Sequence, residues 1–140
     1  MKRIVLDTNC LIASLSKTSK SYGVWKGLYE GRYILCVSNE ILMEYQEIIA
    51  LKTTPEIAEN VIQFLINSEF VEFITPYYHF ELISADRDDN KFVDCAIAAN
   101  ATYIVSDDSH FKPLEQISYP YILVIKLIEF LDILSKDQII

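Results

Sequence analysis

The sequence lacks any apolar run that approaches the length of a membrane span. Its longest candidate, residues 121–128, is interrupted by Lys126. A signal peptide is not indicated either, because Asp7 and Asn9 break the first apolar run within a few positions and no small-residue cleavage site follows. We therefore expect a soluble protein of the cytoplasm that does not contact a membrane.

Cysteine is scarce, and its placement excludes the usual cysteine-based frameworks. Cys10, Cys36 and Cys95 are odd in number, widely spaced and set among apolar neighbours. This pattern does not suit a set of disulfide bonds or a C-x-x-C metal site. We expect three reduced thiols in the core of a protein from a reducing compartment.

Positive charge is also in short supply. Lys and Arg together number 12 against 20 Asp and Glu, which gives a formal net charge of -8. Phosphate contacts need cationic surface, so this balance argues against a protein that holds nucleic acid by bulk electrostatic attraction. Any function on nucleic acid must therefore overcome this negative charge locally.

The remaining composition is that of a globular protein. Apolar residues make up 51% of the 140 residues and charged residues 23%, and we find no internal repeat, low-complexity segment or linker. A chain of this length can bury one core and is too short for two comfortable ones. We expect residues 1–140 to form a single domain.

Strand and helix patterns alternate along the chain. Segments rich in β-branched and aromatic residues predict strands at residues 2–6, 33–37, 70–75, 102–106 and 121–125. Capping residues followed by apolar stripes predict helices that begin near Cys10 and that cover residues 38–51, 55–67, 91–100 and 127–134, with a short helix before the last strand. Several strands are continuously apolar, which requires a sheet covered on both faces. The pattern therefore predicts a layered α/β fold.

Acidic residues follow two of the predicted strands directly. Asp7 comes after the first strand, and Asp107 and Asp108 come after the fourth. In open parallel sheets, functional residues collect just beyond the carboxyl ends of the strands. Asp7 could instead cap the following helix, and one member of the Asp107–Asp108 pair could be a turn residue.

Two further acids lie on predicted helices. Glu44 borders an apolar stripe and should be partly buried, although a residue at a helix edge is often structural. Asp94 lies in "KFVDCAIAANA", which is apolar around nearly its whole circumference, so its carboxylate should be enclosed and in need of a partner. Asp89, at the start of the same helix, is expected to cap it.

A shared cation would explain these four acids together. If Asp7, Glu44, Asp94 and Asp108 converge at the strand ends, each pair at about 4 Å repels by roughly 4 kcal/mol at an effective dielectric constant near 20. A domain with about 5–15 kcal/mol of total stability cannot hold several such pairs without protons or a cation. Oxygen ligands favour Mg²⁺ or Mn²⁺.

Three parts of the sequence together resemble the PIN-domain nucleases, and in particular the small prokaryotic VapC-type toxins. They are "VLDTN" around Asp7, Glu44 on the next helix, and "DDNKFVDCAIAANATYIVSDD" from Asp88 to Asp108. The resemblance implies a three-layer α/β/α sandwich with a central parallel sheet, which binds Mg²⁺ or Mn²⁺ and hydrolyses phosphodiester bonds in RNA. It also implies an antitoxin protein as partner and a homodimer.

The resemblance assigns roles to further residues. Asp7, Glu44, Asp94 and Asp108 match the acids that bind metal and catalyse, while Thr8, Asn9 and Ser106 match supporting positions. Asp107 competes with Asp108 for the fourth place, and Asp89 is a reserve ligand. His110 departs from the pattern, because a further Asp is common there.

The ion would also turn the local negative potential into an attraction for phosphate. Further phosphates could meet lysines in the "SKTSKS" loop or beside the acids, namely Lys17, Lys20, Lys91 and Lys112.

Two other functions remain open from the sequence. A phosphatase with Asp7 as covalent nucleophile fits the position of this acid, but such enzymes carry a second Asp two residues later, where this chain has Asn9. The other is a module that keeps the acids and binds RNA or protein without cutting it.

Overall fold

A parallel β-sheet forms the centre of the protein in the computed structural model, which describes residues 1–83, 87–118 and 120–137. Within these ranges the strand order is β3-β2-β1-β4-β5. The strands are β1 (Arg3–Leu6), β2 (Ile34–Val37), β3 (Val71–Phe73), β4 (Tyr103–Val105) and β5 (Val124–Ile125). The central strand β1 pairs with both β2 and β4, and Leu6 at its end lies beside Val105 at the end of β4. The residues that follow these two strands are therefore neighbours.

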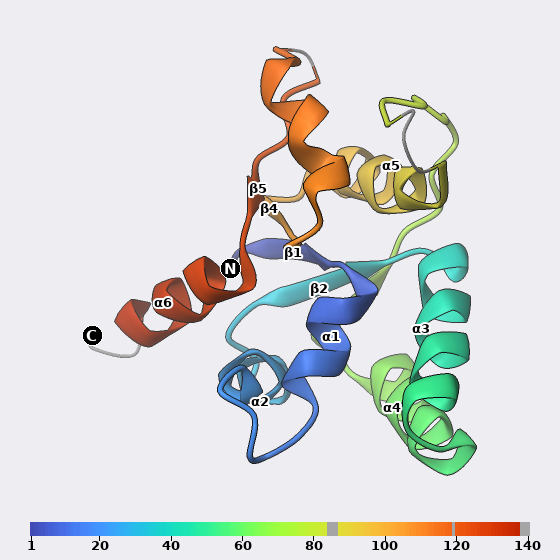
Figure 1. Cartoon of the computed structure of the whole chain (residues 1–140), viewed down its shortest axis with the longest axis vertical. Helices are drawn as coiled ribbons and strands as arrows, with labels where there is room; N and C mark the ends of the chain where they lie inside the picture. The colour runs from blue at the N-terminus through green and yellow to red at the C-terminus, as the bar shows by residue number, and fades with distance from the viewer. Residues whose placement is uncertain (84–86, 119, 138–140) are drawn as a thin grey trace.

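Helices cover both faces of the sheet (Figure 1). They are α1 (Thr8–Ser14), α2 (Tyr22–Tyr29), α3 (Asn39–Lys52), α4 (Pro55–Asn67), α5 (Asn90–Ala99) and α6 (Leu127–Asp137), with short 3₁₀ helices η1 (Arg87–Asp89) and η2 (Ser109–Gln116). Helix α5 packs on one face, and α1, α2 and α6 lie on the other. Helix α3 packs along α4 and also contacts α1 and α5. The predicted three-layer α/β/α fold with a parallel sheet is confirmed.

The starts of α3 and α4 follow from local hydrogen bonding. The Ser38 hydroxyl accepts a hydrogen bond of 3.3 Å from the backbone N–H of Ile41, and the Thr54 hydroxyl accepts one of 3.1 Å from Ile57. Pro55 suits the first turn of α4, where its missing N–H would have no helical partner. The predicted starts of both helices are confirmed.

The core lies on both faces of the central strands. Ile4, Val5 and Leu6 of β1 are fully buried, which explains their uninterrupted apolar run. Complete burial of such side chains contributes about 1.5–3 kcal/mol each. The three cysteines are free and buried, as predicted.

The outer strands β3 and β5 are shorter than predicted. Each has a single neighbour in the sheet, so its length is limited by that neighbour. Strand β5 begins at Val124, opposite Ile104 of β4, and the preceding Tyr121 is exposed instead of paired. In the part of the chain that the structure describes, no helix is long and apolar enough to cross a membrane.

Candidate active site

A serine connects two of the predicted acids at the carboxyl edge of the sheet. Asp7 follows β1 and Ser106 follows β4, and the backbone N–H of Asp7 donates to the carbonyl of Val105 over 3.0 Å. The Ser106 hydroxyl donates to Oδ2 of Asp7 over 2.8 Å and accepts from the backbone N–H of Asp108 over 3.0 Å. Ser106 therefore holds the carboxylate of Asp7 and the backbone of Asp108 in a defined relation.

Asp7 is an acid in an unfavourable environment for its charge. It is only 7% exposed, and burial raises its pKa. Hydrogen bonds from Ser106 and from the backbone of Thr8 oppose this shift, while the nearby charges of Asp108 and Glu44 add to it. Asp7 occupies the N-cap position of α1, but its side chain makes no capping hydrogen bond. Helix capping therefore does not explain this carboxylate.

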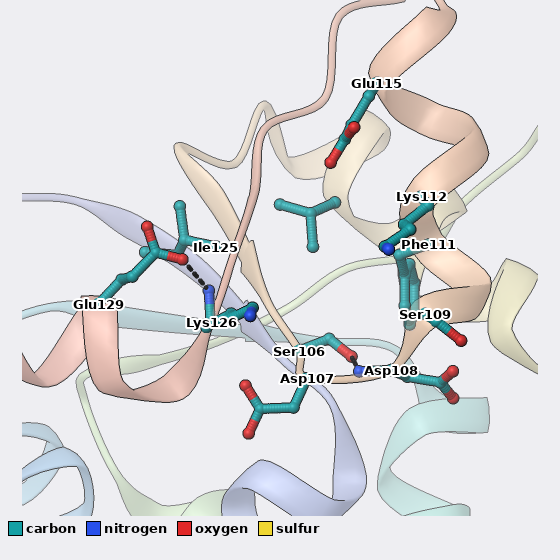
Figure 2. Close-up of a pocket in the computed structure, with 11 residues that line it drawn as sticks. Ser106, Asp107, Asp108, Ser109, Phe111, Lys112, Glu115, Ile125, Lys126 and Glu129 are labelled. Carbon is teal, nitrogen blue, oxygen red and sulfur yellow. Dashed lines mark hydrogen bonds between the residues drawn. The ribbon is translucent and has the colours of Figure 1, made fainter.

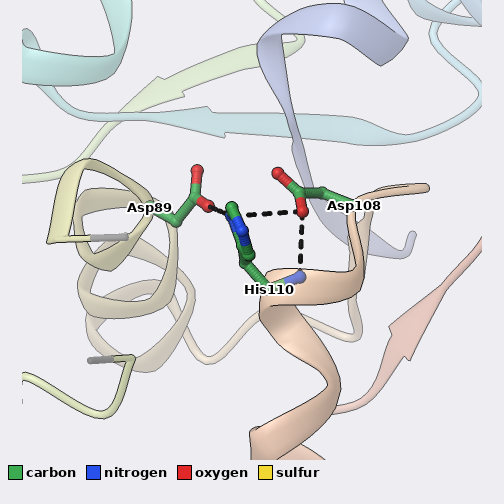
Figure 3. Close-up of side chains that lie close together, drawn as sticks. All are labelled: Asp89, Asp108 and His110. Atoms are coloured by element: carbon green, nitrogen blue, oxygen red, sulfur yellow. Dashed lines mark hydrogen bonds and ion pairs between the residues drawn. The ribbon is translucent and has the colours of Figure 1, made fainter. Parts of the chain in front are cut away.

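Asp89, Asp108 and His110 bring three potential ligand atoms together (Figure 3). His110 Nδ1 lies 3.3 Å from Oδ2 of Asp89 and 3.3 Å from Oδ1 of Asp108. One ligand atom from each residue lies within 4.8 Å of the other two. The backbone N–H of His110 also donates to Oδ1 of Asp108 over 2.9 Å. Asp89 was expected to cap α5, but its side chain makes no capping hydrogen bond and faces His110 instead.

Glu44 lies near Asp7 but is already paired. Its Oε1 lies 2.7 Å from Nζ of Lys91, and its Oε2 accepts a hydrogen bond from the Thr8 hydroxyl. Lys91 also donates to the carbonyl of Asp88 over 2.7 Å. The side chains of Glu44 and Lys91 are 25% and 13% exposed, so the partial burial predicted for Glu44 is confirmed. Lys91 is thus engaged in an internal ion pair, and its contact with RNA stays a prediction.

Asp94 is not brought together with the other acids. Its Oδ1 accepts a hydrogen bond of 3.0 Å from the backbone N–H of Phe80, and its Oδ2 lies 3.2 Å from Nδ1 of His79. The cavities that Asp94 lines include neither Asp7 nor Asp108. Five residues along a helix correspond to a rotation of about 140°, so Asp94 and Asp89 face different directions. In the structure Asp89, and not Asp94, lies beside Asp108.

Asp107 and Asn9 lie near the acids, and each is hydrogen-bonded to another segment. Asp107 accepts a hydrogen bond of 3.1 Å at Oδ1 from the backbone N–H of Leu127, so it is tied to the start of α6. Asp108 is therefore the member of the pair that faces Asp89 and His110. Asn9 accepts a hydrogen bond of 3.0 Å from Lys52 and lines a cavity of about 260 Å³ together with Asp7, Asp107 and Asp108.

A second cavity of about 310 Å³ adjoins the acids between η2 and α6 (Figure 2). Ser106, Asp107 and Asp108 form one side of it, and Lys112 and Lys126 also line it. Among the described residues neither lysine has an ion-pair partner. Lys126 was not singled out from the sequence, because its proximity depends on the course of the chain before α6.

The other two predicted lysines lie elsewhere. Lys17 and Lys20 are exposed in the loop between α1 and α2, which begins beyond the end of α1 opposite to Asp7 (Figure 1). The structure therefore places them away from the acids, in contrast to Lys112.

The sequence also matches a known protein family. A sequence model of the PIN domain family matches residues 3–110. No protein with a curated description matches the sequence significantly.

Several solved structures share the fold of this chain. VapBC2 from Rickettsia felis, bound to a DNA fragment from its promoter, is 20% identical with a TM-score of 0.61, covering 89% of this chain and 98% of that chain. DNA-bound VapBC from Salmonella typhimurium is 21% identical with a TM-score of 0.58, and the match covers 91% of this chain and 99% of that chain. Mycobacterium tuberculosis VapC20, a Sarcin-Ricin loop cleaving toxin, is 15% identical with a TM-score of 0.55, covering 78% and 92%. At these identities the likeness concerns the fold.

Proposed function

Because the chain belongs to the PIN domain family, we propose that it is a metal-dependent endoribonuclease that hydrolyses phosphodiester bonds of RNA. The observation that carries this proposal is the meeting of Asp89, Asp108 and His110 beside the buried carboxylate of Asp7. These residues come from three separate parts of the chain and concentrate negative charge at the carboxyl edge of the sheet. Residues 1–140 would act as one nuclease domain.

The residues present fit a divalent cation. The charged form of Asp7 is disfavoured by burial and by the negative charges of Asp108 and Glu44. A nearby cation would offset all three effects. The carboxylate oxygens of Asp7, Asp89 and Asp108 are ligands suited to Mg²⁺ or Mn²⁺. Glu44 would contribute directly only after release from Lys91, and otherwise it supports the site through Thr8.

The catalytic work divides between the ion and the chain. A divalent cation supplies two kinds of chemistry when bound, a lowered pKa for water and polarisation of the phosphate. Ser106 keeps the carboxylate of Asp7 oriented, and its contact with the backbone of Asp108 fixes the spacing of the two acids. Lys112 and Lys126 would bind a phosphate next to the one that is cut. They share this cavity with Glu115 and Glu129, so they would act as two individual phosphate contacts within a chain of net charge -8.

We further propose that the protein is the toxin of a toxin–antitoxin pair in the cytoplasm. The VapBC structures with the same fold support a protein antitoxin as partner. A homodimer, implied by the resemblance to VapC-type toxins, stays a prediction that sedimentation of the purified protein would test.

Incubation of the purified protein with RNA, in Mn²⁺ or in excess chelator, tests the proposed activity. We expect cleavage only with the ion and its loss in Asp108→Asn. Asp107→Asn is the matched control, because it removes the same charge one residue away and can still accept the hydrogen bond from Leu127. Binding of RNA without cleavage under all conditions would contradict the proposal and favour a non-catalytic binding module.

A further inference from the structure

We propose that His110 supplies a nitrogen ligand to the cation of this site, and that this ligand makes the site select Mn²⁺ over Mg²⁺. The inference rests on the proposed function in one respect, since it concerns the same metal site. It goes further by assigning a role to a residue that departs from the acidic pattern, and by naming the preferred ion.

The spacing of the three ligand atoms suits a single ion. Ligand atoms at right angles on an octahedral ion with bonds of about 2.1 Å lie about 3 Å apart. His110 Nδ1 lies 3.3 Å from an oxygen of Asp89 and 3.3 Å from an oxygen of Asp108. Small movements of these side chains would therefore place all three atoms around one cation.

The position of the imidazole is held from both sides of the site. The backbone N–H of His110 donates to Asp108, whose own backbone N–H donates to Ser106. Asp89 reaches the ring from the start of α5, 21 residues earlier in the chain. Figure 3 shows the ring of His110 between the two carboxylates, with Nδ1 in contact with both.

The chemistry of imidazole then decides between the two candidate ions. Mg²⁺ is a small, hard cation that strongly prefers oxygen and retains several waters. Mn²⁺ also binds carboxylates and has the lowest affinity of the divalent first-row transition metals, but as a transition metal it accepts an imidazole nitrogen more readily than Mg²⁺ does. For ligation the proton of the ring must reside on Nε2, so that Nδ1 can present its lone pair.

The other histidine of the chain provides an internal comparison. His79 Nδ1 also lies near a buried carboxylate, that of Asp94, but the second oxygen of Asp94 accepts a hydrogen bond from the backbone of Phe80. His79 therefore faces a single carboxylate, whereas His110 faces two carboxylates from separate segments. The sequence contains no further histidine, so these two residues account for all imidazole groups.

Calorimetric titration of the full chain with Mn²⁺ and with Mg²⁺ tests this inference without any RNA. We expect wild type to bind Mn²⁺ more tightly than Mg²⁺. His110→Asp replaces a nitrogen ligand with oxygen and should therefore reduce the ratio of the Mg²⁺ dissociation constant to the Mn²⁺ dissociation constant at least tenfold. His79→Ala is the matched control and should leave the ratio unchanged. An unchanged ratio in His110→Asp would overturn the inference.

Pulsed electron paramagnetic resonance of Mn²⁺ bound to wild type gives a second test that does not depend on whether a variant folds. We expect coupling to an imidazole nitrogen, retained in His79→Ala, and its absence would overturn the inference. If Mn²⁺ binds without this coupling and RNA is still cut, only the role of His110 fails. If neither ion binds at all, the proposed metal-dependent function fails as well.

Discussion

Ser106 and Asp7 are joined by a hydrogen bond of 2.8 Å between the serine hydroxyl and Oδ2 of the carboxylate, although 99 residues separate them in the sequence. The contact arises because β1 and β4 are adjacent and parallel, so that the residues after both strands lie at the same edge. Both side chains are buried, and this edge therefore presents a charged group whose orientation is fixed.

Ser106→Ala should weaken cation binding and lower stability together. The change removes the hydrogen bond to the carboxylate of Asp7, which keeps only the one from the backbone of Thr8, and it removes the Ser106 partner of the Asp108 backbone N–H. Loss of such bonds to buried groups costs about 1–3 kcal/mol. Loss of a group that orients a metal ligand lowers affinity roughly 10–100-fold. Titration with Mn²⁺ and a thermal melt measure both effects, and Ser106→Thr should restore affinity because it keeps the hydroxyl. Unaltered affinity in Ser106→Ala would count against Asp7 as a ligand.

Asp7→Asn should stabilise the metal-free protein at neutral pH. The pKa of Asp7 is raised in the folded state, chiefly by burial, so the folded protein binds this proton more tightly than the unfolded chain. The free energy of unfolding therefore falls as pH rises from the ordinary value of 3.8 through the raised pKa, and it stays lower above it. Asn carries no charge and therefore avoids this loss of stability, which is on the order of 1 kcal/mol. Its side-chain oxygen can still accept the hydrogen bond from Ser106.

Thermal melts in chelator between pH 3.5 and pH 8 measure this effect. The advantage of Asp7→Asn should be present at neutral pH and shrink as pH falls toward the ordinary pKa of an aspartate. A variant that is less stable than wild type at pH 7 would show that the charge of Asp7 is already compensated within the chain.

Asp89→Asn and Asp94→Asn should differ, although both remove one carboxylate charge near the same helix. Asp89 faces Asp108 and His110, whereas Asp94 bonds to His79 and Phe80. Asp89→Asn should abolish stabilisation by Mn²⁺, which reaches about 2.7 kcal/mol at a ligand concentration of 100 times Kd. Asp94→Asn should keep this response and lose about 1 kcal/mol of stability because its hydrogen bonds to His79 and Phe80 weaken. The reverse result would restore Asp94 to the site.

Replacing Lys112 and Lys126 by alanine should weaken RNA binding without weakening Mn²⁺ binding. Both lysines line the cavity beside Asp108, and both are exposed, so stability should change by less than about 0.5 kcal/mol. Each lost phosphate contact should reduce the salt dependence of RNA affinity by about one unit of slope. The equivalent double variant at Lys17 and Lys20 serves as the control, and equal effects of the two pairs would indicate nonspecific attraction.

The strands and helices could be predicted because their signals are local. Ser38 and Thr54 mark helix starts by hydrogen bonds that span three residues, and the apolar run of β1 reflects burial on both faces. The positions of Asp7 and Asp108 follow from the rule that residues after parallel strands collect at the carboxyl edge of the sheet. These features need only the pattern of the chain and general rules of packing.

The environment of Asp94 could not be predicted in this way. An apolar helix indicates that its carboxylate is enclosed, but the direction that it faces depends on which segment packs there. The loop that contains His79 and Phe80 supplies the hydrogen-bond partners of Asp94. No local sequence pattern predicts this contact. The contact between His110 and Asp89 likewise depends on the direction that η2 takes after β4.

A crystal structure of the full chain grown with Mn²⁺ and measured for anomalous scattering tests the central claim most directly, because it locates the ion without reference to any activity. We expect one strong anomalous peak bounded by Asp7, Asp89, Asp108 and His110. Crystals in which this position holds no manganese, or in which the ion instead lies beside Asp94, would contradict it.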